Sequence, residues 1–124
     1  MEIGETLEVS HPDDFRKWLD ANATDKSRIW TVIYKKASGK QKVTYPQLVE
    51  VGIAYGWIDS QSKGLDEERY AIRFSPRRPD SNWTDSNKNI ARRLIGEGKM
   101  TPAGKATLPD DLLAEYTQLA NGQP

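Results

Sequence analysis

The residues best suited to chemistry lie between positions 56 and 87, where two tryptophans and four arginines stand among Asp, Ser, Asn, Thr and Pro residues. Arg73, Arg77 and Arg78 fall within six consecutive positions, and the sequence Ser81-Asn82-Trp83-Thr84 follows, at an expected helix start. Guanidinium groups, hydroxyl donors and the free N–H groups of a helix N-terminus are the usual components of an anion site. This segment therefore predicts a site for a phosphate or carboxylate.

The arginines also have a purely structural interpretation, in which they form ion pairs that organise the loop. The candidate partners are Asp59, Asp66, Asp80 and Asp85. Because clustered charges are often structural, the residues alone leave both interpretations open.

The four tryptophans divide into two pairs. Trp18 and Trp30 fit regular apolar patterns and are expected in the core, because an indole buries a large apolar area. Trp57 and Trp83 stand at element boundaries beside polar residues. Trp83 is expected to wall the pocket, whereas Trp57 fits either a pocket wall or, as we favour, a plug at the end of the sheet.

Asp59 lies two residues after Trp57 and so on the same face of an expected strand. Such a carboxylate is a candidate general acid or base, although an ion pair with Arg73 across the sheet is the more common role. The candidate ligand-binding residues are Trp57, Asp59, Arg73, Arg77, Arg78, Ser81, Asn82, Trp83 and Asn87.

Other catalytic patterns are absent from the sequence. His11 is the single histidine and there is no cysteine, which removes the usual zinc sites and the Ser-His and Cys-His nucleophile arrangements. No glycine-rich phosphate loop is present. We therefore expect no metal and no cofactor, and we assign no catalytic residue.

Composition limits the class of protein. Eighteen Lys and Arg residues balance 18 Asp and Glu residues, so no overall field favours nucleic acid or an anionic membrane. Residues 69–93, however, carry a local net charge of +5, and residues 1–25 are acidic. The N-terminus has no apolar core typical of a signal peptide, and no apolar run approaches the roughly 20 residues of a membrane span. The absence of cysteine also fits a reducing compartment, so we expect one cytoplasmic domain over residues 1–124.

The first half of the chain predicts a helix, a strand and a second helix. The first helix begins at Ser10, which has capping-box spacing to Asp13, and its apolar stripe follows over residues 15–19. Residues 29–34 are β-branched and aromatic and predict a buried strand, followed by a basic loop over residues 35–42.

The second helix has the clearest boundaries. Thr44 and Gln47 form a capping box, Pro46 suits the first turn, and Gly56 ends the helix. Residues 57–62 and 69–75 then predict two strands joined by a turn. In the second of these strands Tyr70, Ile72 and Phe74 alternate with Ala71, Arg73 and Ser75, which predicts one buried face and one wet face.

The last third predicts further helices. Thr84 is the expected N-cap of a helix that ends near Gly96 and Gly98, and Thr101 before Pro102 marks another start. The apolar side chains expected to pack inward are Ile90, Ala91, Leu94, Ile95, Leu112, Leu113, Tyr116 and Leu119. The order predicts an α+β fold with a small, mostly antiparallel sheet of about three strands, packed by four to five helices. Residues 10–107 form its core, and residues 108–124 add a C-terminal helix with a frayed tail.

Several strings in this chain resemble a known bacterial family. They are Ala54-Tyr55-Gly56-Trp57-Ile58-Asp59, Arg73-Phe74-Ser75-Pro76-Arg77-Arg78-Pro79, Ser81-Asn82-Trp83-Thr84 with Asn87, and Met100-Thr101-Pro102-Ala103-Gly104. Together with Tyr34-Lys35-Lys36 and Tyr45 they are similar to the YdeI/OmpD-associated (bacteriocin-protection) family over about residues 13–107. The tail over residues 108–124 departs from the family's pattern.

The resemblance implies a context rather than a reaction. The family's name connects it with bacteriocin protection and an outer-membrane porin, which implies a role in envelope stress. It implies no ligand and no activity, and it does not decide whether the matching residues serve binding or folding.

Three functions are consistent with the sequence. The first is binding of a small anionic ligand, with Arg73, Arg77 and Arg78 as charge anchors and Trp83 as a wall. The second is an enzyme of unassigned class with Asp59 as acid or base. The third is a protein or nucleic-acid interaction module that uses the basic 69–93 face. We expect the small ligand and rank nucleic acid last, because the overall charge is zero.

Overall fold

The computed structural model describes residues 4–78 and 81–120, the last five of these by backbone only. Along the chain the elements are β1 (Thr6–Glu8), α1 (Pro12–Asn22), β2 (Ile29–Tyr34), the single 3-10 turn η1 (Lys36–Ser38), α2 (Tyr45–Tyr55), β3 (Trp57–Gly64), β4 (Arg69–Pro76), α3 (Asp85–Gly96), α4 (Pro102–Lys105) and α5 (Asp110–Ala120). The α+β class is therefore confirmed. None of the helices in these ranges has the length and apolarity to cross a membrane.

The four strands form one mixed sheet in the order β1-β2-β4-β3. β4 pairs antiparallel with both β2 and β3, so the three predicted strands are all present. β1 was not predicted, and the expectation that ordered structure begins at Ser10 is wrong, because β1 pairs in parallel with β2 in the register Thr6 to Trp30. A strand of three residues whose first and last side chains are exposed shows little hydrophobic periodicity. It could therefore not be predicted from its own sequence, without knowledge of its pairing with β2.

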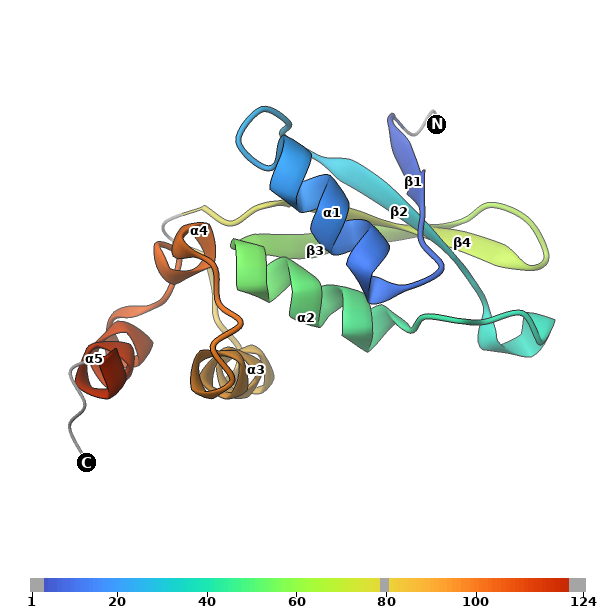
Figure 1. Cartoon of the computed structure of the whole chain (residues 1–124). Helices are drawn as coiled ribbons and strands as arrows, with labels where there is room; N and C mark the ends of the chain where they lie inside the picture. The colour runs from blue at the N-terminus through green and yellow to red at the C-terminus, as the bar shows by residue number, and fades with distance from the viewer. Residues whose placement is uncertain (1–3, 79–80, 121–124) are drawn as a thin grey trace.

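Helices α1 and α2 lie on one face of the sheet (Figure 1). Their buried side chains meet those of the strands in the main core, which is built from Val9, Phe15, Leu19, Ile29, Ile33, Val43, Leu48, Val51, Trp57, Ile72 and Phe74. The other face of β4 is less exposed to solvent than predicted. Ala71 is fully buried there, in a cluster with Trp30 and Val32, because the Trp30 indole covers the neighbouring strand.

Local capping explains where the first two helices begin. The α2 boundaries agree with prediction, since Thr44 and Gln47 cap each other reciprocally and Gly56 adopts φ 78° after the last turn. The prediction for α1 is wrong by one residue. Its N-cap is His11, whose Nδ1 accepts from the Asp13 N–H, while the Asp14 carboxylate accepts from the His11 N–H. Pro12 fixes this choice, because it fits the first helical position.

A second core lies where α3, α4 and α5 gather beside α2 (Figure 1). Its buried members are Ile53, Ala54, Ala91, Leu94, Met100, Leu108 and Leu112. In α5, Leu112 is buried but Leu113 is 43% exposed, which corrects the expectation for Leu113. The predicted packing of Tyr116 and Leu119 and the frayed end at residues 121–124 lie outside the described side chains and residues.

The short helix α4 is fixed to the end of α2 by direct backbone contact. The N–H and the Oγ1 hydroxyl of Thr101 both donate to the Ala54 carbonyl, at 3.0 and 2.7 Å. Gly104 then lies against the same carbonyl, where a Cβ would be 2.2 Å from the Ala54 oxygen. Glycine at this position therefore allows the approach of two backbones and does not merely weaken a helix.

Replacing Gly104 by Ala is expected to lower the free energy of unfolding by about 1–3 kcal/mol, because a backbone atom has to move to admit the methyl group. The measurement is urea unfolding followed by tryptophan fluorescence. Gly96→Ala is the matched control, since no atom lies within 4 Å of its Cβ position. It should be neutral or stabilising by up to about 1 kcal/mol, and equal destabilisation by both changes would contradict the interpretation.

Candidate functional site

Arg77 directly follows the last residue of β4. Its backbone is held by Gly56, the residue that ends α2 and comes directly before β3. Its N–H donates to the Gly56 carbonyl at 2.8 Å. Gly56 ends α2 in a left-handed conformation and begins the path into β3. Arg77 is thereby placed where α2 ends, at the open end of the β3–β4 hairpin opposite its turn.

The Arg77 guanidinium is buried and stacked. The residue is 7% exposed, and its Cζ lies 3.8 Å from the centroid of the Trp83 ring. Nη1 donates to the Ser81 hydroxyl at 3.0 Å and to the Asn82 carbonyl at 3.4 Å. A guanidinium over an indole face is a favourable cation–π contact, so Arg77 organises the loop that leads to α3.

Two further donors of Arg77 have no acceptor among the described residues. Nε and Nη2 are buried and have no hydrogen-bond partner among the described residues. These two nitrogens carry parallel N–H groups on one edge of the planar group, which is the edge that binds a carboxylate or phosphate through two hydrogen bonds. The loop thus accepts hydrogen bonds from Nη1 only, and the edge that carries Nε and Nη2 has no acceptor among the described residues.

The charge of Arg77 is likewise uncompensated by direct contact. Burial lowers the pKa of Arg77, while the charge of Asp59 acts in the opposite direction. Arginine nevertheless remains protonated at any physiological pH. No described carboxylate lies within the 4.0 Å of an ion pair with this guanidinium, although buried charges are normally paired.

Trp83 connects this loop to the second core. Its ring packs against that core as a partly buried member. The following residue, Thr84, is the N-cap of α3, and its hydroxyl accepts from the Asn87 N–H at 3.1 Å. The predicted role of Trp83 as a wall beside an arginine therefore has a geometric counterpart, and Asn87 takes part in the cap through its backbone.

Asp59 lies on β3 and is held by a tyrosine from α2. The Tyr45 hydroxyl donates to Asp59 Oδ2. Burial, and then the hydrogen bond to this carboxylate, raise the pKa of Tyr45, so the phenol stays neutral. Tyr45 was absent from the predicted site, because a tyrosine in the first turn of a helix shows no sign of reaching a strand 14 positions later.

The structure separates some of the predicted residues from Arg77. Trp57 is 2% exposed and packs edge-on against Trp18 at 5.7 Å, as the plug interpretation expects. Arg73 pairs across the sheet with Trp30, over whose ring it lies at 6.0 Å, and its Nε donates to the Ser60 hydroxyl. The expected pairing of Arg73 with Asp59 is therefore wrong.

Arg78, next to Arg77, is exposed. The structure thus brings Arg77, Ser81, Asn82 and Trp83 into contact and places Asn87 at the adjoining cap. Asp59 lies on the same hairpin end, within reach of their electrostatic field. Of the acids expected to organise the loop, Asp80 lies outside the described residues, and Asp66 binds Arg69 instead.

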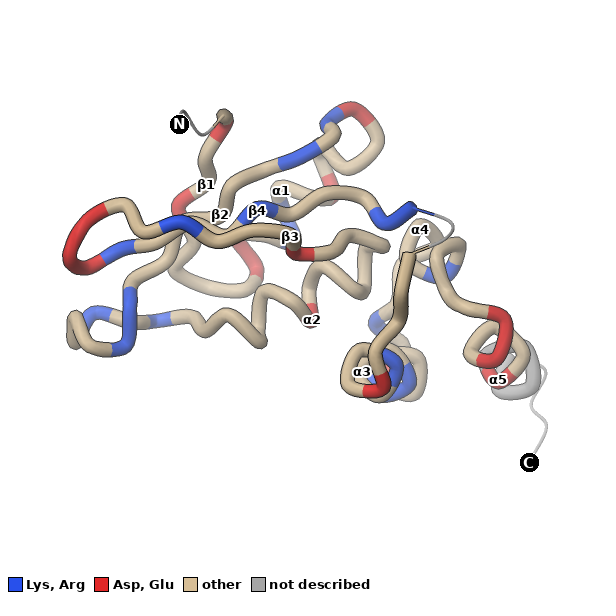
Figure 2. The backbone as a smooth tube through the Cα atoms, turned by 180° about the vertical axis from the view of Figure 1, so that it is seen from behind, with Lys and Arg blue, Asp and Glu red and all other residues tan. Residues whose placement is uncertain are grey.

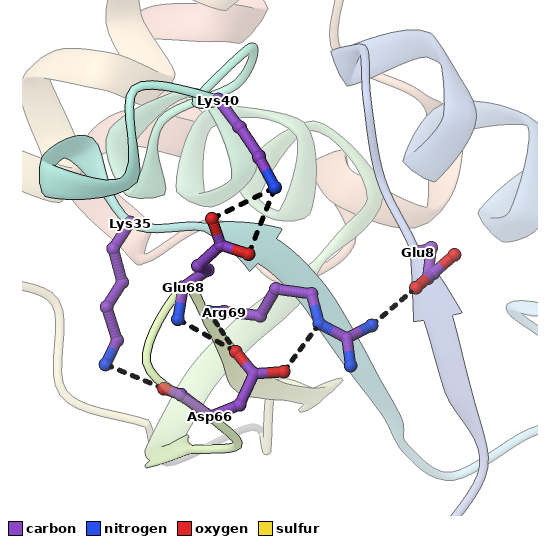
Figure 3. A network of polar contacts seen from close by, with 6 residues as sticks. All are labelled: Glu8, Lys35, Lys40, Asp66, Glu68 and Arg69. Atoms are coloured by element: carbon purple, nitrogen blue, oxygen red, sulfur yellow. Dashed lines mark hydrogen bonds and ion pairs between the residues drawn. The ribbon is translucent and has the colours of Figure 1, made fainter.

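The basic residues of segment 69–93 are spread over β4, the segment that follows it and α3 (Figure 2). Most are neutralised by carboxylates from other elements. Arg69 contacts Asp66 at 3.0 Å and Glu8 at 2.8 Å, within the polar network at the hairpin turn (Figure 3). Further pairs are Lys88–Asp111, Arg92–Glu115, Arg93–Glu50 and Arg93–Glu97.

Two open clefts lie elsewhere on the surface. One of about 340 Å³ between α1, α2 and α3 has an apolar floor, and its rim includes Asp13, Arg16, Glu50 and Lys99. Another of about 230 Å³ adjoins β1 and β2. In the first, Asp13 binds Arg16 and Glu50 binds Arg93. Within the described residues, no group of three His, Cys, Asp or Glu side chains is placed to hold a metal ion.

Comparison with known proteins gives one match. The family model described as Domain of unknown function (DUF8412) matches residues 7–107, from within β1 to just after α4. No curated protein and no solved structure matches the chain.

Replacing Arg77 by Lys is expected to lower the free energy of unfolding by about 1–3 kcal/mol, because lysine keeps the charge but loses the planar stack and the bonds to the loop. Urea unfolding of the two proteins measures the difference. The exposed neighbour gives a matched control, since Arg78→Lys should change stability by less than about 0.5 kcal/mol. Similar losses in both variants would show that the stack contributes nothing specific.

The Tyr45–Asp59 bond predicts a pH dependence. Because the folded pKa of Tyr45 is raised, its contribution is complete below the unfolded value of about 10 and is lost as the pH rises through the folded value. Tyr45→Phe should cost about 1 kcal/mol at pH 8, and the difference from wild type should shrink above pH ~10. Urea unfolding of both proteins at pH 8 and 11 tests this, since the raised pKa of Tyr55 is common to both. A difference that does not change with pH would refute it.

Proposed function

The chain belongs to the family described as a domain of unknown function, DUF8412, and we propose that this domain binds a small anionic ligand, a carboxylate or phosphate, at Arg77. The observation that carries the proposal is the pair of buried Arg77 donors, Nε and Nη2, that have no acceptor among the described residues. A planar anion would accept from both donors at once.

The energetics favour an occupied site. A buried donor without a partner costs about 1–3 kcal/mol, and here two such donors belong to one charged group. A structural arginine could satisfy them with a backbone carbonyl or an aspartate, as Arg69 does with Asp66 and Glu8. A charge-assisted bidentate bond to a ligand would recover this cost and neutralise the charge.

Access to the site requires a local movement. Because Nε and Nη2 have almost no exposed surface, an anion reaches them only after a local movement of the groups that cover them. Trp83 is partly buried and belongs to the second core, so binding would be reported by its fluorescence and by the amide signals of α3.

The alternatives have less support. Asp59 as a catalytic acid or base has a hydrogen-bond partner in Tyr45, but the described residues form no group of His, Cys, Asp or Glu side chains placed to hold a metal ion. An interaction module on the 69–93 face is weakened by the ion pairs of Arg69, Lys88 and Arg92. The resemblance to the YdeI/OmpD-associated family stays a prediction, and from it we propose a role in envelope stress or bacteriocin protection.

Phosphate and acetate are expected to stabilise the wild-type protein against heat, and Arg77→Lys should remove most of the effect. Binding to the folded state alone adds about 2.7 kcal/mol at a hundredfold excess over Kd, which is a shift of several degrees for a domain of this size. Arg78→Lys should keep the shift, and chloride at equal ionic strength controls for screening. Equal shifts in all three proteins would place the effect elsewhere, and no shift with either anion would refute the proposal.

A further inference from the structure

Two opposite charges lie at the same end of the β3–β4 hairpin without pairing. Arg77 is joined by its backbone to Gly56, and Asp59 follows three residues later on β3, where it pairs with Phe74 of β4. Trp57 and Pro76 are paired between them. Although the hairpin brings both side chains to this end, Arg77 and Asp59 form no ion pair within 4.0 Å of each other.

Each of the two groups is instead positioned by a different part of the protein. Arg77 is stacked on Trp83 and bound through Nη1 to the loop, while Asp59 is held through Oδ2 by Tyr45 of α2. Each group can form further hydrogen bonds. The Nε/Nη2 edge of Arg77 has no acceptor among the described residues, and no described donor reaches Oδ1 of Asp59.

This separation is costly for a pair with only a structural role. Two opposite unit charges in contact near a protein surface attract each other. A fold that held them for stability alone would bring them together. Each side chain is held in place by other residues, and one has unused hydrogen-bond donors while the other has an unused acceptor. This arrangement suits a ligand that lies between them.

We propose, building on the anion site at Arg77, that the ligand is a small zwitterion whose carboxylate binds the Nε/Nη2 edge of Arg77 and whose ammonium binds Asp59. A ligand with one charge of each sign compensates both the buried Arg77 and the half-buried Asp59, whereas a simple anion would neutralise Arg77 and repel Asp59. The chemical class is therefore that of small amino acids.

The hairpin gives a rough length for this ligand. Three residues of strand separate Gly56 from Asp59, which is about 10 Å at ~3.3 Å per residue. The separation between the two charges of the ligand is then the quantity that a series of different lengths measures. A series of ω-amino acids, in which the distance between ammonium and carboxylate increases, can therefore measure the separation that the site prefers.

The test measures dissociation constants for glycine, β-alanine and γ-aminobutyrate, each beside the acid of the same carbon count that lacks the amine: acetate, propionate and butyrate. Two-dimensional amide NMR of the whole chain follows the binding. At least one amino acid should bind about tenfold more tightly than its matched acid, the size of one charge-assisted hydrogen bond. Asp59→Asn should abolish that advantage and leave the simple acids unchanged or improved.

Controls separate the two proposals. Asp25→Asn, in an exposed turn after α1, should keep the wild-type preference. If acids and amino acids bind equally well, the zwitterion proposal fails while the anion site stands. If neither series binds, both fail. Should Asp59→Asn not fold, the comparison of matched ligands on the wild-type protein decides alone, because it needs no variant.

Discussion

The fold depends on the junction at Gly56, where three parts of the chain meet. Gly56 ends α2 with φ 78°, which L side chains rarely adopt, and its carbonyl accepts the N–H that follows β4. On its other side a Cβ would come within 2.9 Å of the Ala103 carbonyl oxygen. One residue without a side chain therefore allows the helix to end, the open end of the hairpin to be held and α4 to dock, and the backbone position of Arg77 follows from this geometry.

Two cores share this junction. The main core lies between the sheet and helices α1 and α2, and the second joins α2 to α3, α4 and α5. Val49 and Tyr55 pack against both, so α2 is the common wall. The stack of Arg77 on Trp83 is a further connection, since Arg77 extends from the sheet and Trp83 belongs to the second core. A ligand at Arg77 would bind where the two cores are connected.

Much of the fold was predictable because local chemistry specified it. The Thr44–Gln47 box, Gly56 and the alternation in β4 act within a few residues, and the elements they predict are present. The β1 strand and the Tyr45–Asp59 bond were missed because they depend on segments distant in sequence. For the site, the contact of Arg77 with Ser81, Asn82 and Trp83 is local and follows from their spacing. The separation of Arg73 from Asp59 could not be predicted, because it follows from the strand register, in which Asp59 lies opposite Phe74 and Gln61 opposite Arg73.

The position of β2 in the sheet has a consequence for folding kinetics. β2 is central, yet its antiparallel partner is remote in sequence, with Ile29 opposite Phe74. The β3–β4 hairpin and α2, by contrast, form one continuous stretch of chain. Because long loops cost more entropy to close, α2 and the hairpin can assemble first, and β2 then adds to the exposed edge of β4. Until β2 arrives, that edge and its apolar face are open to pairing with another chain, so the refolding yield should depend on protein concentration.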